Sequence, residues 1–368
     1  MNATPKCTVL IVDDQAANID VLVGALRDAY QITVARDGKT ALEVVADSPP
    51  DLILLDIIMP GMNGYEVCRR LKSSELTRVV PVIFLTALAD EADEAAGLAL
   101  GAVDYITKPF NPALVKARIR NNLELKRHRD HLEELVTERT REAALAKEVT
   151  IDGLATLAEY RDPETGGHIQ RTKNYVRVLA EALRRIPRYQ AVISETVVDR
   201  MHKCAALHDI GKVGVRDSIL LKPGSLTKEE FVEMKRHTEY GANAIQKTEE
   251  KLQATDSFLA FAREIAWTHH ERWDGTGYPR GLRTDEIPLS GRIMALADVY
   301  DALISRRVYK PPFSHHQALE IIRNGDGRTL PCHFDPEVLA VFIDQERSIL
   351  RIASKFADSD EEKRALTS

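Results

Sequence analysis

Four short apolar runs recur in the first third of the 368-residue chain, with longer amphipathic stretches between them. They lie at Val9–Val12, Leu52–Leu55, Val82–Leu85 and, more weakly, Ala102–Ile106. Apolar runs of this length that alternate with helical segments predict a parallel, doubly wound α/β sheet. Such a sheet constrains the whole region, because parallel strands end at a common edge and ligands bind outside that edge.

Each of these runs ends in a polar residue that suits phosphate chemistry. Asp13 and Asp14 follow the first run and Asp56 the second, while Thr86 follows the third and Lys108 comes just after the fourth. Carboxylates hold Mg²⁺, an aspartate can accept a phosphoryl group, and a lysine offsets charge on phosphoryl oxygens. A strand-end aspartate often only caps the next helix. Five such residues on successive strand ends favour a phosphate-handling site instead.

Longer motifs surround these positions. They are Ile11-Val12-Asp13-Asp14, Leu55-Asp56-Ile57-Ile58-Met59-Pro60-Gly61, Leu85-Thr86-Ala87 and Asp104-Tyr105-Ile106-Thr107-Lys108-Pro109-Phe110. Together they resemble the flavodoxin-like receiver domain of response regulators. The resemblance implies Asp56 as the phosphoacceptor, with Asp13, Asp14 and Asp56 at a Mg²⁺ site. It also implies Thr86, Tyr105 and Lys108 as the groups that respond to phosphorylation, and a cis bond between Lys108 and Pro109.

A long stretch without helix-breaking residues follows, from Pro112 to about Thr150, and predicts one continuous helix. Two series of residues in it repeat every seven positions: Leu125, Leu132, Arg139 and Ala146, and His128, Leu135, Glu142 and Val149. Half of these residues are polar or small, so a coiled coil would be marginal. A dimer-forming helix and a lone exposed linker both stay open, and we expect a homodimer.

The chain after Thr150 has helical periodicity throughout, which predicts an all-α domain. We expect His208 and Asp209 to end a helix that Gly211 terminates. A capping box at Thr227 begins another helix, on which His237 is expected to point inward.

The histidines and carboxylates of this domain form a candidate metal-binding set. Taken singly, a buried histidine is more often a hydrogen-bonded core residue than a metal ligand. Taken together, they match the way in which helix bundles build dinuclear carboxylate–histidine sites. Because no thiolate belongs to the set, Fe, Mn, Zn, Co or Ni is favoured over softer metals. The set comprises Glu164, His168, His208, Asp209, His237, His269, His270 and Asp298.

The motifs around these residues carry a second resemblance. They are Glu164-Thr165-Gly166-Gly167-His168, His208-Asp209-Ile210-Gly211-Lys212, His269-His270-Glu271-Arg272, Gly277-Tyr278-Pro279 and Ala297-Asp298-Val299-Tyr300-Asp301. They look like the HD-GYP subfamily of metal-dependent phosphohydrolases, so the whole chain resembles cyclic di-GMP phosphodiesterase response regulators. The resemblance implies that this set holds two metals bridged by Asp209, with Glu164 at a third in some members.

The same resemblance implies further roles. His208, Asp209 and Lys212 would be catalytic, and Asp162, Tyr278, Arg307 and Lys310 would bind substrate. Metal ions activate water for hydrolysis, so no protein nucleophile is required. Fe or Mn is favoured at this site, with Ni, Co and Zn as alternatives, and Mg²⁺ in the receiver.

We therefore expect a receiver over residues 1–123, a helical linker over 124–150, an HD-GYP domain over 151–352 and a flexible tail over 353–368. The expected function is hydrolysis of cyclic di-GMP to pGpG, and onward to GMP, regulated by a sensor histidine kinase that phosphorylates Asp56. Two alternatives stay open. One is a hydrolase that prefers pGpG or another cyclic dinucleotide, and the other is an adaptor that binds diguanylate cyclases through its Gly-Tyr-Pro surface.

Composition narrows the setting. The formal net charge of −6 gives no reason to expect binding to DNA or to a membrane surface. The longest apolar runs are too short to span a bilayer, and the N-terminus lacks the apolar core of a signal peptide. Four scattered cysteines without a C-x-x-C pair fit a reducing compartment, so we expect a cytoplasmic protein.

Overall fold

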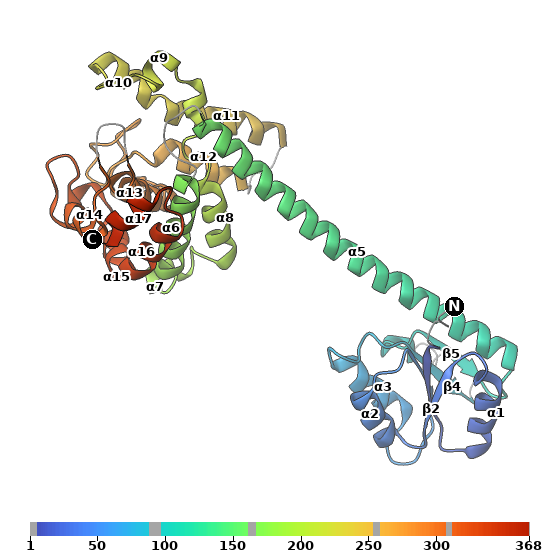
Figure 1. Cartoon of the computed structure of the whole chain (residues 1–368). Coiled ribbons are helices and arrows are strands. Elements are labelled where there is room, and N and C mark those ends of the chain that lie inside the picture. Colours follow the sequence, from blue (N-terminus) through green and yellow to red (C-terminus); the bar gives the residue numbers. More distant parts are fainter. Residues whose placement is uncertain (1–5, 88–96, 161–166, 253–257, 307–310, 368) are drawn as a thin grey trace. The chain divides into compact units, whose positions relative to one another are not determined.

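The computed structural model describes residues 6–87, 97–160, 167–252, 258–306 and 311–367 (Figure 1). The chain divides into two compact units, residues 1–141 and 142–368, which are treated separately below. Among the described helices, none is both long enough and apolar enough to cross a membrane.

The first unit is built on a parallel sheet with the strand order β2-β1-β3-β4-β5. The five strands are β1 (Thr8–Val12), β2 (Gln31–Ala35), β3 (Leu52–Asp56), β4 (Val82–Thr86) and β5 (Asp104–Thr107). The doubly wound α/β prediction is confirmed, and β2 is the strand that the sequence reading missed. It lies at the edge of the sheet, where Gln31 and Val34 are exposed, so its sequence is not a continuous apolar run.

Helices cover both faces of this sheet. One core joins α1 (Ala16–Leu26) and the first turns of α5 (Pro112–Glu159) to one face, and the other core joins α2 (Gly38–Asp47) and α3 (Gly64–Ser73) to the opposite face (Figure 1). The central strands are buried on both sides, and each fully buried Leu, Ile or Val contributes roughly 1.5–3 kcal/mol. This packing fixes the strand ends that carry the candidate receiver residues.

Helix α5 is 48 residues long, so the predicted continuous helix is confirmed and extends nine residues beyond Thr150. The Asn111 side chain accepts hydrogen bonds from Ala113 N and Leu114 N at its start. Leu125, Leu132 and Leu135 are exposed on it. Whether they pair with a second copy of the chain stays a prediction.

The second unit is helical, as predicted, apart from three short 3₁₀ turns in the described residues. Its elements after α5 are α6 (Gly167–Leu183), α7 (Pro187–Gln190), α8 (Glu195–Ala205), η1 (Ile210–Gly214), α9 (Asp217–Leu220), α10 (Lys228–Lys235), α11 (His237–Leu252), α12 (Phe258–Thr268), η2 (Thr284–Glu286), α13 (Leu289–Ile304), α14 (His315–Asn324), η3 (Pro331–His333), α15 (Pro336–Asp344), α16 (Glu346–Lys355) and α17 (Asp360–Thr367). One large core draws on α6, α8, α12, α13 and α15.

The chain near His208 differs from the prediction. Helix α8 ends at Ala205, so His208 and Asp209 lie in a turn that leads into η1 rather than at a helix end. Gly211 does not terminate a helix. A Cβ atom at this position would lie 1.9 Å from the carbonyl oxygen of His237, so glycine is required because η1 and α11 approach so closely.

The helix that was expected to carry His237 is two helices. The capping box at Thr227 is confirmed and begins α10, but α10 ends at Lys235 and His237 opens α11. No glycine or proline marks the break. The helical periodicity of the sequence runs across it, which is why a single helix was expected. His237 is 2% exposed, as expected of an inward residue, whereas Phe231 is half exposed.

Residues 353–368 were expected to be a flexible tail, and the structure contradicts this. Helix α16 continues to Lys355 and α17 follows it, with Leu366 in the core of the second unit. The composition of α17 is strongly polar, but Glu362 is only 4% exposed because its carboxylate accepts hydrogen bonds from Arg306 N and Asp358 N. The sequence shows these charged residues but not the hydrogen-bond partners that allow them to be buried.

Candidate functional site

The carboxyl edge of the sheet in the first unit gathers the predicted acidic residues. Lys108 Nζ lies 2.9 Å from both Asp13 Oδ2 and Asp56 Oδ2. Asp13, Asp14 and Asp56 offer oxygens within 4.8 Å of one another. Asp14 Oδ1 is buried without a hydrogen-bond partner, which is costly unless a cation binds it. The arrangement therefore fits a hard divalent cation such as Mg²⁺.

The predicted switch residues lie around the same edge. Thr86 ends β4 and is buried, and its carbonyl oxygen accepts a hydrogen bond from Lys108 N. Thr86 and Tyr105 line one small cavity, and the Lys108–Pro109 bond is cis, as the resemblance implied. Burial raises the pKa of Asp56 and outweighs the effect of Lys108.

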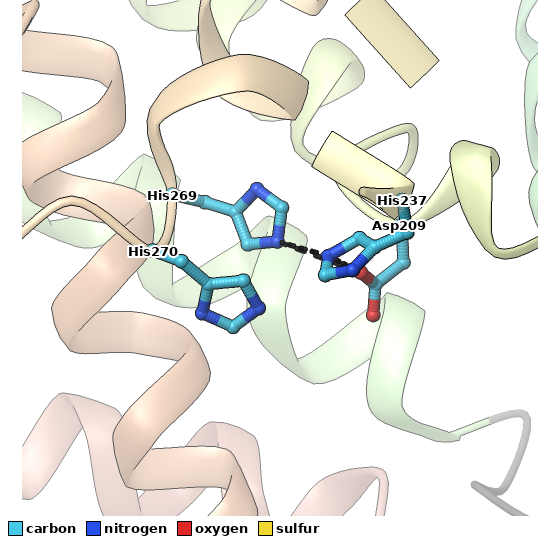
Figure 2. Close-up of side chains that lie close together, drawn as sticks. All are labelled: Asp209, His237, His269 and His270. Atoms are coloured by element: carbon cyan, nitrogen blue, oxygen red, sulfur yellow. Dashed lines mark hydrogen bonds and ion pairs between the residues drawn. The ribbon is translucent and has the colours of Figure 1, made fainter. Parts of the chain in front are cut away.

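The second unit brings together seven of the eight predicted metal ligands. Asp209, His237, His269 and His270 form one group, with ligand atoms within 4.8 Å of one another (Figure 2). His168, His208 and Asp209 form a second group by the same measure. Asp209 belongs to both groups, which is the position required of a bridging carboxylate.

Four of the histidines are held in the same way. Their Nδ1 atoms lie 2.8–3.0 Å from an oxygen acceptor: Asp301 Oδ2 for His168, Ala205 O for His208, Met234 O for His237 and Ile265 O for His269. A neutral imidazole that donates from Nδ1 presents a lone pair at Nε2. Outer partners of this kind are those that fix metal-binding histidines.

The Nε2 atoms of these four histidines converge in pairs. His168 Nε2 lies 3.1 Å from His208 Nε2. His237 Nε2 lies 3.3 Å from His269 Nε2, and Figure 2 shows this second pair. Two lone pairs cannot hydrogen-bond to each other, so each pair calls for a cation. Asp209 Oδ1 is also buried without a hydrogen-bond partner. The donor set therefore fits two divalent ions, and it consists of imidazole nitrogens and carboxylate oxygens.

Charge and burial at this centre shift the pKa values of four ligand candidates. Burial on its own would raise the pKa of Asp209, but Lys212 and His208 outweigh it and hold that pKa well below its usual range. Burial lowers the pKa of His269 and His270, so both are neutral near pH 7. The carboxylate of Asp209 outweighs burial at His208 and raises its pKa.

Asp298 and Lys212 complete the described part of the centre. Asp298 Oδ1 lies 3.8 Å from His168 Nε2 and 3.9 Å from His208 Nε2, on the side of the second group. Lys212 Nζ lies 2.7 Å from Asp209 Oδ2 and is close to both groups through this carboxylate. A cation at this place can stabilise negative charge on a phosphate.

A cavity of about 250 Å³ adjoins the centre. The metal-ligand candidates His269 and His270 line it, together with Tyr278, Phe231 and Lys235. The Tyr278 ring stacks on His270, with ring centroids 4.7 Å apart and planes 32° apart. This places Tyr278 beside the metal-ligand candidates, in reach of an aromatic group of a ligand.

Four predicted residues fall outside the described residues: Asp162, Glu164, Arg307 and Lys310. Asp301 had a place in a quoted motif but no predicted role, and Arg171 had no predicted role either. Asp301, three positions after Asp298 on α13, accepts a hydrogen bond from His168 Nδ1, and Arg171 pairs with Asp301. The spacing of three on one helix is the signal that could have found Asp301.

A third cluster, Asp274, Cys332 and His333, has metal-ligand residue types but not the electrostatics. His333 Nδ1 accepts a hydrogen bond from Leu330 N, and its Nε2 faces a second N–H donor. The guanidinium of Arg272 lies 3.3 Å from this Nε2. A cation is already in place, and a metal site does not follow.

Comparisons with known proteins agree with this architecture. A model of the response regulator receiver domain matches residues 9–120 and a model of the HD domain matches residues 153–338. The chain is 48% identical over 367 residues to a probable cyclic di-GMP phosphodiesterase of Vibrio cholerae serotype O1, a match that covers 98% of this chain and 82% of that protein.

Two further relatives match at nearly full length. A cyclic di-GMP phosphodiesterase of Thermotoga maritima is 36% identical over 369 residues, covering 96% of this chain and 94% of that protein. The cyclic di-GMP phosphodiesterase response regulator RpfG of Xanthomonas campestris pv. campestris is 34% identical over 359 residues, with 95% and 90% covered. The chain belongs to the family of response regulators in which a receiver domain precedes an HD domain.

Proposed function

We propose that this chain is a metal-dependent phosphodiesterase that hydrolyses cyclic di-GMP to pGpG, and onward to GMP, under the control of phosphorylation at Asp56. One observation carries the enzymatic part: the Nε2 atoms of four histidines converge in pairs around Asp209, whose Oδ1 atom is buried without a hydrogen-bond partner. The substrate is inferred from the names of the near full-length relatives, which are cyclic di-GMP phosphodiesterases.

The proposed ligands divide between two ions. His237, His269 and His270 would hold one ion, His168, His208 and Asp298 the other, and Asp209 would bridge them. Glu164 is the proposed ligand of a third ion in members that bind one. Fe or Mn is the metal we favour, with Ni, Co or Zn as alternatives. Bound divalent ions polarise phosphoryl oxygens and lower the pKa of water from about 16 to about 7.

The remaining side chains would hold the substrate. Lys212 has its ammonium group 2.7 Å from the bridging carboxylate, where it can steady a phosphate oxygen. Tyr278 borders the adjoining cavity and offers an aromatic face to a guanine base. Asp162, Arg307 and Lys310 are the further substrate-binding residues that we propose.

The receiver would supply the control. Asp56 would accept a phosphoryl group from a sensor histidine kinase, with Mg²⁺ at Asp13, Asp14 and Asp56. Lys108 already contacts the Asp56 carboxylate and would pair with the added charge. Thr86 and Tyr105 line the cavity beside this site, so a shift of either residue can report the change.

The cellular location, the oligomeric state and a protein partner are also proposed. A cytoplasmic location is supported by four free cysteines. A homodimer is supported by the exposed leucines of α5, and disulfide crosslinking of cysteines introduced at Leu132 and Leu135 tests it. Binding of a diguanylate cyclase through the Gly277-Tyr278-Pro279 turn is the proposal for a protein partner.

The test is a substrate panel. Protein purified without oxygen and loaded with Mn²⁺ or Fe²⁺ is assayed on cyclic di-GMP, on pGpG and on another cyclic dinucleotide. We expect turnover of cyclic di-GMP with pGpG as the first product. Faster turnover of pGpG or of the other cyclic dinucleotide would replace the substrate assignment. If metal-loaded protein hydrolyses none of these substrates, the adaptor function would replace the proposed enzymatic function.

A further inference from the structure

A segment outside the metal centre reaches back to one of its proposed ligands. Phe356–Leu366, called the C-terminal strap here, comprises the turn after α16 and most of α17. It lies beyond residue 338, where the HD-domain match ends. Its side chains and backbone contact α6, the helix that carries His168, and Arg306, which follows the end of α13.

The connection begins at His168. While its Nε2 atom faces His208, its Nδ1 atom lies 2.8 Å from Asp301 Oδ2. Asp301 has no exposed surface. Both of its carboxylate oxygens also accept hydrogen bonds from Arg171, at 2.7 Å from Nε and 2.9 Å from Nη2. The orientation of the His168 ring therefore depends on where Arg171 holds Asp301.

Arg171 is 1% exposed, and all five of its N–H donors are used. Two are directed at Asp301 and one at Ser305 Oγ. The other two go to the strap, at 2.9 Å from Phe356 O and 2.7 Å from Asp358 Oδ2. A guanidinium group is planar and rigid, so partners on one side fix its position on the other.

Asp358 also contacts the start of α6 directly. Its Oδ1 atom accepts a hydrogen bond from Gly167 N at 2.9 Å, one residue before His168. A Cβ atom at Gly167 would lie 2.5 Å from Phe356 O and 2.6 Å from Asp358 Oδ1, so the strap can lie this close only against glycine. One carboxylate thus holds both the helix end that bears His168 and the arginine behind it.

The strap is itself anchored. Glu362 Oε2 accepts a hydrogen bond from Asp358 N and Glu362 Oε1 accepts one from Arg306 N, each at 2.9 Å. Leu366 is buried in the core of the second unit. Asp358 is therefore fixed at its backbone as well as at its side chain, as an outer partner that orients a ligand must be.

We infer that Asp358 is a positioning residue for metal binding: through Arg171 and Asp301 it sets the orientation of His168, and so the affinity for the ion that His168 would hold. This rests on the proposed metal-dependent function. Outer partners of metal ligands typically change metal affinity by about 10–100-fold. The Asp358 side chain is 20% exposed and acts through two other residues, so the lower end, about tenfold, is expected.

The experiment measures metal binding without any assay of hydrolysis. Chelator-treated, full-length protein is titrated with Mn²⁺, and free Mn²⁺ is followed by electron paramagnetic resonance. Asp358→Ala is expected to weaken one of the two sites about tenfold and to leave the other unchanged. Asp358→Asn, which keeps one acceptor oxygen, is expected to weaken it less. Glu361→Ala is the matched control. Glu361 is also an acidic residue of the strap, but its side chain is exposed and forms an ion pair with the exposed side chain of Arg306.

A double-mutant cycle separates positioning from general damage. His168→Ala removes the ligand itself, so adding Asp358→Ala to it should cause no further loss of Mn²⁺ affinity. Two Mn²⁺ sites of wild-type affinity in Asp358→Ala would overturn the inference, and so would additive losses in the double variant. A wild-type protein that binds no divalent metal would instead overturn the proposed function, and the inference with it.

Discussion

The two candidate metal sites of this chain differ in the charge and in the residue types of their ligands. At the receiver edge, three carboxylates lie together and Lys108 offsets part of their charge. At the second centre, the Asp209 carboxylate, which both ligand groups share, is surrounded by imidazoles, and four of them are held by a hydrogen bond at Nδ1. The first site is rich in negative charge and suits a hard ion and a transferable phosphoryl group. The second suits borderline transition metals that stay bound.

The comparison shows two ways of assembling a site. In the receiver, strand order alone brings Asp13, Asp14 and Asp56 to one edge. In the second unit, the candidate ligands come from α6, α11, α13 and the turns after α8 and α12, and hydrogen bonds to outer partners orient four of the five imidazole rings. Substitutions of residues outside the ligand set should therefore impair the second site more than the first.

The largest effect is expected when the bridging ligand is lost. In His208→Ala/Asp209→Ala, each proposed ion loses a ligand, and hydrolysis should fall by more than about a thousandfold. Metal analysis should show fewer ions per chain, while transfer of phosphate to Asp56 is unchanged. His131→Ala is the matched control, because His131 is an exposed histidine on α5 that lies outside both seven-residue series. Undiminished hydrolysis by the double variant would end the metal mechanism.

A smaller effect is expected when the receiver is silenced. Asp56→Asn removes the phosphoacceptor, so a small-molecule phosphodonor should no longer change the rate of hydrolysis. In the wild type the donor should change it by about 5–150-fold, the usual range of coupling between two sites. Metal content should be the same in both proteins. An equal response to the donor in Asp56→Asn would show that the donor controls hydrolysis through a residue other than Asp56.

The smallest effect concerns Mg²⁺ at the receiver. Because Asp14 Oδ1 is buried without a hydrogen-bond partner, Mg²⁺ should stabilise this unit, by about 2.7 kcal/mol at a hundred times its dissociation constant. Calorimetry with increasing Mg²⁺ measures the shift, and Asp14→Ala should abolish it. A shift that persists in Asp14→Ala would mean that Mg²⁺ binds somewhere other than this carboxylate cluster.

The sequence predicted the receiver edge more fully than the second centre, for a physical reason. Polar residues at strand ends reveal their place because the topology of a parallel sheet is general. The edge strand β2 was missed, since one exposed side leaves it without a continuous apolar run. The motifs predicted the candidate ligands of the second unit and Asp209 as the bridge between two metals, but not which histidines gather on each side of Asp209.

Outer partners were the least predictable. The break between α10 and α11 at Arg236 carries no glycine or proline, so no residue pattern indicates that His237 opens a new helix. Asp358 is 187 residues from Arg171 and 191 from Gly167 along the chain. Local periodicity cannot connect such residues, and a polar C-terminal segment therefore resembled a free tail.

The most direct test of the account is a titration of metal-free protein with Mn²⁺ in which bound metal and turnover of cyclic di-GMP are measured together. Turnover is predicted to be absent from the chelated protein, to rise with occupancy and to reach its maximum once the ions bridged by Asp209 are both bound. Full turnover by protein that retains no metal would contradict the account.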